Sequence, residues 1–419
     1  MAPQRPVEPM QFALAGSATP RTAVSLSLSD SVLRLIWREQ EISRAEIARR
    51  TGLARSTVSE LVADLVQSGL VIEVGPGPSR GGRRPIVLRF EDTARLILGV
   101  EMGAAHVAVA LTDLRGRVLA WREQPHQVRT DPTGTRSLIL ELADASLTSV
   151  RGSRRRLLGI GVAVPSPVDP RQPDRLSEIV LPAWGGQSGL AETLARYQVP
   201  WFVDNDANLG ALAEGWWGAG RGVNDFAYVK VATGVGSGHV IGGEIYRGAT
   251  GVAGEIGHMA VDPLGPQCIC GLRGCLATLV GAQALVERAR ALRTAHPESS
   301  LATREPTIAA IEDAALTGDP LALALAHDAA QHLGVALVGM LNLMNPARVI
   351  LGGGLARLGE LLLEPIRETV RSRTLVSAGA AAEIRTSELG PQAVAIGAAT
   401  LVLTAALADT RLFAATTAP

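Results

Sequence analysis

Short apolar runs of β-prone residues recur along most of this chain with helical stretches between them, and this alternation constrains its fold more than any other feature. The clearest runs read LILGVEMGAAHVAVAL, LLGIGVAVP, VPWFV, DFAYVKVATGVGSGHVI and ARVILGGGL. Strands that alternate with helices favour an α/β architecture. With 47% apolar residues in 419, the chain can bury more than one core, and we expect two lobes around a cleft over residues 91–410.

Residues 29–90 carry a different pattern, in which short helices precede a hairpin. Asp30 is placed to cap a first helix. The apolar stripe of this helix consists of Val32, Leu33, Leu35 and Ile36. The stretch SRAEIARRTGLARSTVSELVADLVQSGL predicts two further helices with a tight corner at residues 51–53, and two β-prone runs joined by GPGPSRGGRRP follow it. We interpret this order as a winged helix-turn-helix.

Such a module suits DNA, because the first turn of its second helix stays free to enter the major groove. The side chains of this turn are Arg55, Ser56, Thr57 and Ser59, which can contact phosphates and base edges. The tip of the hairpin carries Arg80, Arg83 and Arg84, which can neutralise phosphates or enter the minor groove. The alternatives are an ordinary helical hairpin with solvated polar residues and, for the tip, a solvated charged loop.

The overall charge gives no hint of a partner, because 40 Lys and Arg balance 40 Asp and Glu. Residues 1–28 are rich in Pro, Ala and Ser and are predicted to be a disordered tail, with no basic segment before a sustained apolar stretch as in a secretory signal. The run AVAIGAATLVLTAALA from Ala393 is short and Ala-rich, so we expect a buried helix and no membrane span. These features predict a cytoplasmic chain with reduced thiols.

Three stretches of the predicted α/β part are candidates for binding a phosphate or a polar ligand. TGVGSG at residues 233–238 has glycines that let backbone N–H groups converge on an anion, and LGGGL at 351–355 follows a strand. VDNDAN ends another strand with Asp204, Asn205, Asp206 and Asn208, where a carboxylate can act as a general base on a hydroxyl. A tight strand-to-helix turn explains the glycines equally well, and an Asx-rich turn explains VDNDAN.

The motifs VDNDAN, TGVGSG, YRGATGVAGEIGH and CICGLRGC, which lie within residues 30–405, resemble those of the ROK family of repressors and sugar kinases, specifically its regulators with an N-terminal winged helix-turn-helix. The resemblance implies an actin-like ATPase fold, with two α/β lobes and a sugar site between them. It implies that Asp206 occupies the position of the kinase base and that Asn205, Glu255 and His258 contact sugar hydroxyls. It also implies phosphate or nucleotide contacts from Gly103, Thr233, Gly234, Gly236, Gly238, Gly352, Gly353 and Gly354.

Two departures from the family pattern concern the phosphate and sugar contacts. Family kinases carry Asp-x-Gly-x-Thr in the first phosphate loop, whereas residues 101–105 here read EMGAA. The longer carboxylate and the missing hydroxyl remove contacts on which phosphoryl transfer depends, because that chemistry is mostly positioning and charge neutralisation. The family motif Cys-Leu-Glu reads CLA at 275–277, which removes one sugar-contacting carboxylate. We therefore predict that kinase activity has been lost.

All three cysteines of the chain, Cys268, Cys270 and Cys275, follow His258 within 17 residues. Together they supply four ligands, enough for a closed tetrahedral zinc site of the structural kind in a loop spanning residues 258–275. Glu255 lies three residues before His258, so the metal would also hold the predicted sugar-binding turn in shape. The alternative is a reduced cluster without metal.

These features together predict a transcriptional regulator, a sugar-responsive repressor, that binds operator DNA as a homodimer or homotetramer. A sugar or sugar phosphate in the cleft would shift lobe closure and move the paired DNA-binding modules, and Asp206 would accept a hydrogen bond without acting as a base. One alternative is an active ATP-dependent sugar kinase with a DNA-binding arm. A second is a constitutive DNA-binding protein whose larger part serves only for oligomerisation.

Overall fold

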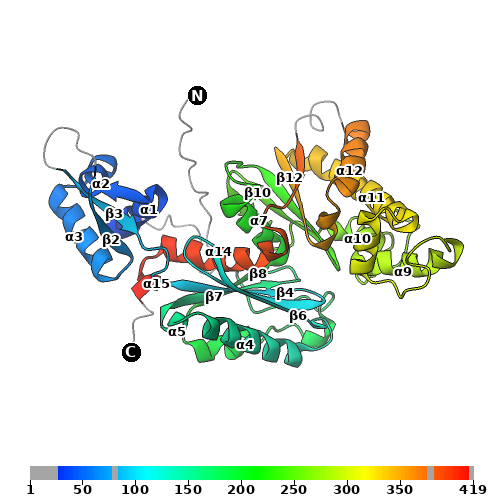
Figure 1. The fold of residues 1–419 in the computed structure, drawn as a ribbon, viewed down its shortest axis with the longest axis horizontal. Helices are drawn as coiled ribbons and strands as arrows, with labels where there is room; N and C mark the ends of the chain where they lie inside the picture. Colours follow the sequence, from blue (N-terminus) through cyan, green and yellow to red (C-terminus); the bar gives the residue numbers. More distant parts are fainter. Residues whose placement is uncertain (1–26, 78–83, 375–381, 415–419) are drawn as a thin grey trace.

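The computed structural model describes residues 27–77, 84–374 and 382–414, which form a small N-terminal head and a two-lobed body (Figure 1). The head contains α1 (Leu28–Glu39), β1 (Glu41–Ser43), α2 (Arg44–Thr51), α3 (Arg55–Gln67), β2 (Val71–Pro76) and β3 (Ile86–Phe90). The predicted tail overlaps the described residues only at 27 and 28, where Leu28 already begins α1.

The head is a helix-turn-helix followed by a hairpin, as the sequence predicts. The apolar faces of α1 and α3 pack together through Val32, Leu33, Ile36, Val58 and Val62, all fully buried. Strands β2 and β3 pair antiparallel, and the unpredicted strand β1 adds to β3, giving the order β1-β3-β2.

The first cap of the head differs from its prediction. Ser27, not Asp30, is the N-cap of α1, and Asp30 completes a capping box from the third helical position.

The first lobe of the body is built on a five-stranded sheet of order β6-β5-β4-β7-β8. Its strands are β4 (Leu96–Met102), β5 (His106–Thr112), β6 (Val118–Pro125), β7 (Leu157–Val164) and β8 (Trp201–Asn205). Its outer face is covered by α4 (Pro132–Ser149), α5 (Ser153–Arg156) and α6 (Leu190–Leu194), which follow the sheet along the lower edge of Figure 1. Strands β4 to β6 are antiparallel, whereas β4, β7 and β8 run parallel.

The second lobe repeats this arrangement with the order β11-β10-β9-β12-β13. Its strands are β9 (Phe226–Val231), β10 (Val235–Ile241), β11 (Glu244–Tyr246), β12 (Arg348–Gly352) and β13 (Glu383–Thr386). Its helices are α8 (Ala277–Val280), α9 (Ala282–Leu292), α10 (Ile308–Leu316), α11 (Pro320–Met344) and α12 (Glu360–Arg373). The same strand order, with β9, β12 and β13 parallel, makes the two lobes topological equivalents.

Two equivalent helices pack against each other between the sheets. Helix α7 (Asp206–Trp217) follows β8, and α14 (Ala393–Ala408) follows β13. Close packing of α14 on α7 requires glycine, because a Cβ on Gly397 would lie 1.8 Å from the Leu209 carbonyl oxygen, and Gly99 and Gly161 let the first sheet approach α14 in the same way. The run from Ala393 is therefore a buried core helix, as predicted, although α11 and residues 390–408 are both long and apolar enough to span a membrane.

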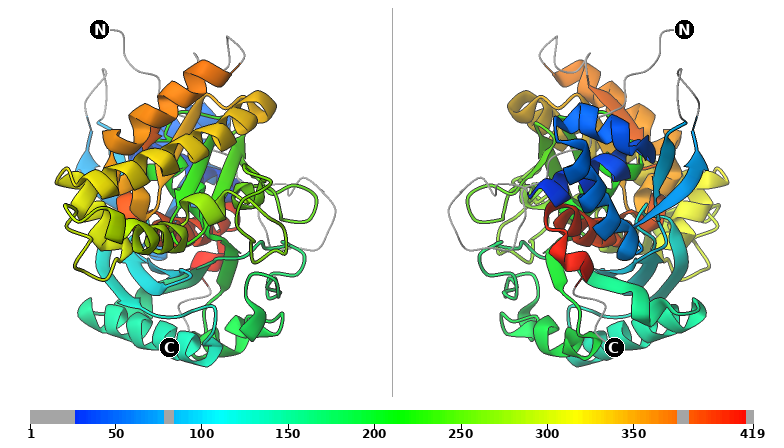
Figure 2. Two further views of the ribbon diagram at one scale, coloured as in Figure 1. Left: turned by 90° about the vertical axis from the view of Figure 1, so that its right-hand side faces the viewer. Right: turned by 90° about the vertical axis from the view of Figure 1, so that its left-hand side faces the viewer.

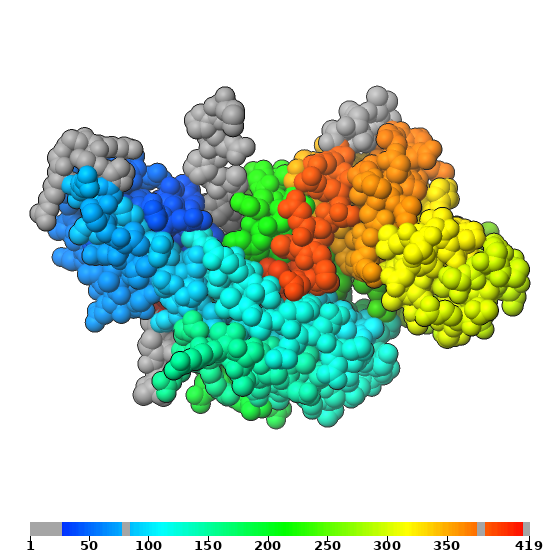
Figure 3. Space-filling view, in the orientation of Figure 1, coloured from blue at the N-terminus to red at the C-terminus, as the bar shows by residue number. Residues whose placement is uncertain are grey.

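The head is docked on the body and shares one hydrophobic core with it. This core joins Val32 and Ile36 of α1 to Leu403, Ala406 and Leu407 of α14. The last described helix, α15 (Arg411–Ala414), lies beside the head, as the right view in Figure 2 shows. In the space-filling view the head projects from one end of the body (Figure 3).

Candidate functional site

A cavity of about 830 Å³ lies between the two lobes, within the size range of small-molecule sites. All four residues predicted to contact a sugar line it: Asn205, Asp206, Glu255 and His258. Of the predicted phosphate and nucleotide residues, Gly103, Thr233, Gly234 and Gly236 also line it. The cavity therefore brings the predicted sugar contacts and part of the predicted phosphate contacts together; we call these two groups of residues the sugar side and the phosphate side.

Asn205 and Asp206 lie where β8 ends and α7 begins. The Asn205 side chain caps α7, because its Oδ1 accepts from the N–H groups of Ala207 and Asn208 at 2.9 and 3.2 Å. Its Nδ2 donates to the carbonyl oxygen of Ser166 at 3.2 Å. This cap fixes the start of the helix and directs the Asp206 carboxylate into the cavity.

The two other polar residues of VDNDAN do not line the cavity. Asp204 is buried and pairs with Arg247, whose Nε and Nη2 lie 2.9 and 2.6 Å from its Oδ2. Asn208 is buried too, and its Nδ2 donates to Asp204 Oδ1 at 3.1 Å. Asp204 and Asn208 thus fix the strand end, as an Asx-rich turn does, while Asn205 and Asp206 face the cleft.

Glu255 and His258 come from a short turn that approaches the cavity from the second lobe. Burial, and then the negative charge of Asp206, raise the pKa of Glu255 to about 7. Burial lowers the pKa of His258, which favours the neutral imidazole that binds metals. His258 Nδ1 lies 3.5 Å from Cys268 Sγ and Nε2 lies 3.9 Å from Glu255 Oε2, so one ring nitrogen faces the cysteines and the other the cleft.

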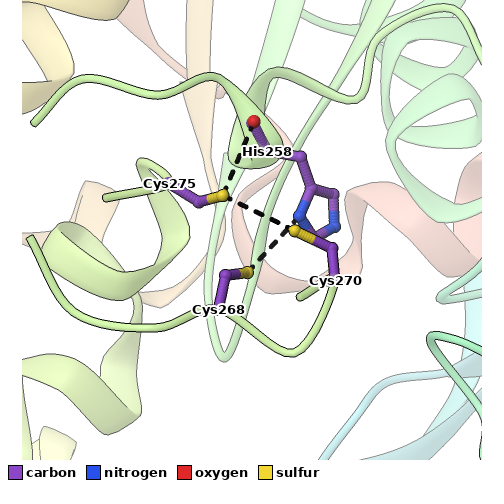
Figure 4. A group of neighbouring side chains, drawn as sticks. All are labelled: His258, Cys268, Cys270 and Cys275. Carbon is purple, nitrogen blue, oxygen red and sulfur yellow. Dashed lines mark hydrogen bonds between the residues drawn. The ribbon is translucent and has the colours of Figure 1, made fainter. Parts of the chain in front are cut away.

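His258, Cys268, Cys270 and Cys275 converge on one point (Figure 4), and their ligand atoms all lie within 4.8 Å of one another. The sulfurs of Cys270 and Cys275 are 3.6 Å apart. A tetrahedral site with metal–sulfur bonds of about 2.3 Å places its sulfurs roughly 3.8 Å apart, so these two sulfurs already lie near the spacing that a metal ion requires. Gly274 permits the fold of this loop, since its φ is +67° and a Cβ would lie 1.4 Å from the Asp262 carbonyl oxygen.

The predicted glycine contacts divide into cleft residues and packing residues. Gly234 has no atom within 4 Å of where a Cβ would lie, so its backbone is open to the cavity. Gly238, by contrast, allows β10 to approach α7, because a Cβ there would lie 2.4 Å from the Ala207 carbonyl oxygen. Gly352 and Gly353 similarly pack against Tyr228 and Val231 of β9, and Gly354 faces Glu312. These four glycines are not among the cavity-lining residues, which favours the packing interpretation of them.

The first phosphate turn, after β4, is covered by its own side chains. The His106 imidazole packs over Gly103, where a Cβ would lie 2.3 Å from its Cε1. Glu101 is buried and accepts from Lys230 Nζ at 2.7 Å. Ala277, which replaces the family glutamate, lines the cavity, so the cleft lacks the carboxylate that the family motif would place there.

Lys230, His106 and Arg129 line the cavity but were not predicted from the sequence. The sequence does contain an indication that Lys230 is functional, because it is the one lysine of the chain and lies inside the otherwise apolar strand FAYVKV. A charged residue in a fully buried strand requires a partner, which points to a site. Arg129 and His106 lie in or beside connecting turns, where charged residues are common and carry no such signal.

The head presents the predicted DNA-binding turn to solvent. Arg55, Ser56 and Ser59 are exposed at the start of α3, while Thr57 is half-buried. The N-cap of α3 is Ala54, which makes no side-chain cap, so the first N–H groups of the helix remain available to a phosphate. Arg84 is exposed beside β3, whereas Arg80 and Arg83 lie outside the described residues.

A tryptophan cluster joins the head to the C-terminal end of α7. The ring of Trp37, from α1, lies 5.4 Å from that of Trp216 and 6.3 Å from that of Trp217. Trp37 Nε1 donates to the carbonyl oxygen of Leu114 at 3.2 Å, and the Arg115 guanidinium lies 4.5 Å over its ring. Trp217 Nε1 donates to Thr400 Oγ1 of α14 at 2.8 Å, which ties both inter-lobe helices to the cluster.

Helix α14 also reaches the head at its C-terminal end. Arg34 Nε of α1 donates to the carbonyl oxygen of Leu407 at 2.5 Å, and the Thr410 N–H donates to Asp30 at 3.0 Å. Both inter-lobe helices therefore end on α1.

Comparison with known proteins identifies this architecture. Residues 97–405 match the ROK family, and residues 31–72 match a winged helix-turn-helix DNA-binding family. The chain belongs to the ROK family, and its domain order makes it a DNA-binding transcriptional regulator of that family. The predicted fold class, an N-terminal winged helix-turn-helix before a two-lobed actin-like body, is confirmed.

Two relatives match almost the whole chain. The xylose repressor of Bacillus spizizenii is 33% identical over 378 residues, which cover 89% of this chain and 94% of the relative. The DNA-binding transcriptional dual regulator NagC of Escherichia coli K12 is 33% identical over 381 residues, which cover 90% and 93%.

Solved structures separate the regulators from the kinases. A ROK family transcriptional regulator described as a homolog of the E. coli MLC protein superposes with a TM-score of 0.74 at 26% identity, covering 93% of this chain and 98% of that one. A ROK family glucokinase from Streptomyces griseus, in complex with glucose and AMPPNP, gives a TM-score of 0.65 at 30% identity and covers 73% of this chain. The regulator thus matches across a larger part of this chain than the kinase does.

Proposed function

We propose that this regulator is a cytoplasmic, sugar-responsive repressor that binds operator DNA as a homodimer or homotetramer. Residues 29–90 read the DNA, with base and phosphate contacts from Arg55, Ser56, Thr57 and Ser59 and wing contacts from Arg80, Arg83 and Arg84. Residues 91–410 sense the effector. Pairing of two heads suits an operator with two half-sites, because their spacing must match the spacing of the half-sites.

The effector belongs to the sugars or sugar phosphates and binds on the sugar side of the cleft. Asn205, Asp206, Glu255 and His258 are its contacts, and all four line the cavity. Asp206 and Glu255 offer carboxylate oxygens, which bind sugar hydroxyls as charge-assisted acceptors. The relative named as a xylose repressor supports a sugar as the class of effector.

The observation that carries this proposal is the course of the two inter-lobe helices. Helix α7 begins at Asp206 in the cleft and ends at Trp217 against Trp37 of the head. Helix α14 packs beside it and ends at hydrogen bonds with α1. A sugar that changes the closure of the lobes must therefore shift the ends of α7 and α14, on which α1 of the head is packed. This shift changes the distance and orientation between the two heads of an oligomer.

The regulator has no kinase activity in this proposal. Phosphoryl transfer needs a positioned metal–phosphate group and a free base, but the first phosphate turn lacks its threonine and Asp206 is paired with Lys230 at 2.9 Å. The sugar-kinase alternative predicts turnover of ATP with a hexose. The constitutive alternative predicts operator binding that no sugar alters.

The metal of the His258 and cysteine cluster is zinc in a structural role, because four thiolate and imidazole donors leave no open position. Its part in sensing is indirect. By fixing His258 it holds Glu255 at the cleft, three residues earlier in the same turn.

The direct test is operator binding in the presence of sugars. Operator sequences are selected from random DNA with the full-length protein, and fluorescence anisotropy then measures affinity with a panel of sugars, sugar phosphates and nucleotides. We expect one sugar or sugar phosphate to change operator affinity at least about fivefold. The absence of any effector in the panel would favour the constitutive alternative, and turnover in a coupled ATP assay would favour the kinase.

A further inference from the structure

Lys230 is the only lysine of the chain, because the other basic residues among its 40 Lys and Arg are arginines. It lies in β9, a strand whose residues are all buried. Arginine is planar and forked, whereas the lysine ammonium is a compact point charge with three donors. A chain that uses arginine everywhere else has therefore placed its single ammonium inside the cleft.

The ammonium of Lys230 lies between two carboxylates from different parts of the fold. Nζ is 2.7 Å from Glu101 Oε1, at the end of β4 in the first lobe, and 2.9 Å from Asp206 Oδ2, at the start of α7. The side chains of Lys230, Glu101 and Asp206 are only 10%, 3% and 15% exposed. His106 Nε2, at 3.6 Å from the same Glu101 oxygen, is the next basic group.

These charges stabilise one another in a nearly dry environment. Burial alone would raise the pKa of Glu101, but Lys230 and His106 lower it to about 2. The carboxylates raise the pKa of Lys230 above its usual value against the opposing effect of burial. Glu101 and Lys230 are thus charged together, and the Asp206 carboxylate is the second acceptor of the same ammonium.

Two buried carboxylates directed at one point are also the arrangement that binds a divalent cation such as Mg²⁺. An ammonium and a metal ion cannot share that point, because two cations at such a distance repel strongly in a low dielectric. We propose that Lys230 is a built-in cation that occupies the metal position between Glu101 and Asp206 and makes the cleft a sugar site that works without metal or nucleotide. This inference rests on the proposed non-catalytic function and gives its physical cause.

The built-in cation has a second consequence for Asp206. One of its oxygens already accepts from Lys230 and the other from the N–H of Ala207 at 2.8 Å. The remaining lone pairs can accept a sugar hydroxyl, while the ammonium of Lys230 occupies the oxygen that a general base would need free. Lys230 therefore leaves Asp206 able to hold a sugar hydroxyl while removing its use as a base.

The single lysine provides its own probe. Full-length protein labelled with [ε-¹³C]lysine gives one lysine side-chain signal, from the centre of the site. We expect excess Mn²⁺, a paramagnetic substitute for Mg²⁺, to leave this signal sharp with or without ADP. The cysteine cluster does not compete, since thiolates disfavour Mn²⁺. Selective broadening of the signal by Mn²⁺ in the wild-type protein would overturn the proposal.

The Lys230→Gln variant supplies the converse measurement. Without the ammonium, the two carboxylates should bind about one Mn²⁺ per chain, seen by electron paramagnetic resonance, and the Lys230→Gln, Glu101→Gln double variant should lose it again. A Lys230→Gln protein that folds, as judged by operator binding, and takes up no Mn²⁺ would count against the proposal. Should the variant not fold, the wild-type lysine signal still decides.

Failure of this inference is separable from failure of the proposed function. Mn²⁺ bound beside Lys230, together with sugar-dependent operator binding, would refute the built-in cation alone. A lysine signal that stays sharp, together with operator binding that no sugar alters, would refute the proposed sugar response and leave the inference on Lys230 standing.

Discussion

The sugar side and the phosphate side of the cleft differ in the side chains that surround them. On the sugar side, Asp206, Glu255 and His258 face the cavity and are held by a helix cap and a metal-ligand loop. On the phosphate side, His106 covers Gly103, and Lys230 neutralises Glu101. The predicted sugar contacts are supported by surrounding residues, whereas the first phosphate turn is occupied by side chains of the protein itself, although Gly234 of the second loop stays open to the cavity. The difference supports the proposal that this regulator binds a sugar and has lost phosphoryl transfer.

The largest effect is expected from the sugar side, at Asp206. Asp206→Asn removes a charged acceptor and should weaken sugar binding about 100-fold, which corresponds to about 3 kcal/mol. Isothermal titration calorimetry with the identified effector measures the affinity, and operator binding without sugar should stay within about twofold. Glu364→Gln, an exposed carboxylate of α12 outside the cavity, is the matched control. Sugar affinity that is equal in both variants would remove Asp206 from the site.

Loss of the metal should have the next largest effect on the sugar side. Cys270→Ser should lower the zinc content from about one ion per chain and weaken sugar binding roughly 10- to 100-fold, because His258 and Glu255 lose their support. Metal analysis and calorimetry on the same preparation measure both. Leu272→Ser changes an exposed residue of the same loop that is no ligand and should alter neither. A zinc-free protein with full sugar affinity would separate the metal from sensing.

A change at the far end of α7 should reduce coupling and spare both binding sites. Trp216→Leu removes part of the aromatic contact with Trp37, so the effect of sugar on operator affinity should fall about fivefold. Sugar affinity and operator affinity, each measured alone, should stay within about threefold. Trp121→Leu, on the edge strand β6, serves as the control. Undiminished coupling in Trp216→Leu would mean that α14 alone carries it.

The smallest effect is expected on the phosphate side. Glu101→Asp combined with Ala105→Thr restores the kinase motif of the first turn, yet ATP turnover with a panel of hexoses should stay undetectable, because Lys230 still holds the metal position. A coupled spectrophotometric assay measures it. Turnover in this double variant would show that the motif, and not Lys230, is what blocks the reaction.

Local signals in the sequence sufficed for most of the elements and for the cysteine cluster, whereas the sugar contacts at Asn205, Glu255 and His258 were predicted from the family resemblance. The helix-turn-helix, the two α/β lobes and the convergence of His258 with three cysteines follow from periodicity, turn residues and ligand spacing. The cap of α1 was misassigned, since Ser27 and Asp30 both favour an N-terminus and the choice depends on where the helix starts.

Features that depend on tertiary contacts could not be predicted from local sequence patterns. Gly238, Gly352 and Gly353 look like phosphate-loop glycines, but they serve close packing, which depends on strands and helices distant in sequence. Likewise, nothing local indicates that Trp37 meets Trp216 and Trp217, some 180 residues away, or that Lys230 bridges the lobes to Glu101, 129 residues earlier. Pairings of this kind are settled by topology.

The central claim is that sugar binding in the cleft is coupled to operator binding by the head. Isothermal titration calorimetry of sugar binding tests this claim most directly. Sugar affinity is measured for the free protein and for the protein saturated with operator DNA. Linkage requires the ratio of these two affinities to equal the factor by which sugar changes operator affinity, and we expect a ratio of at least about five. Equal sugar affinities for the free and the operator-bound protein would contradict the claim.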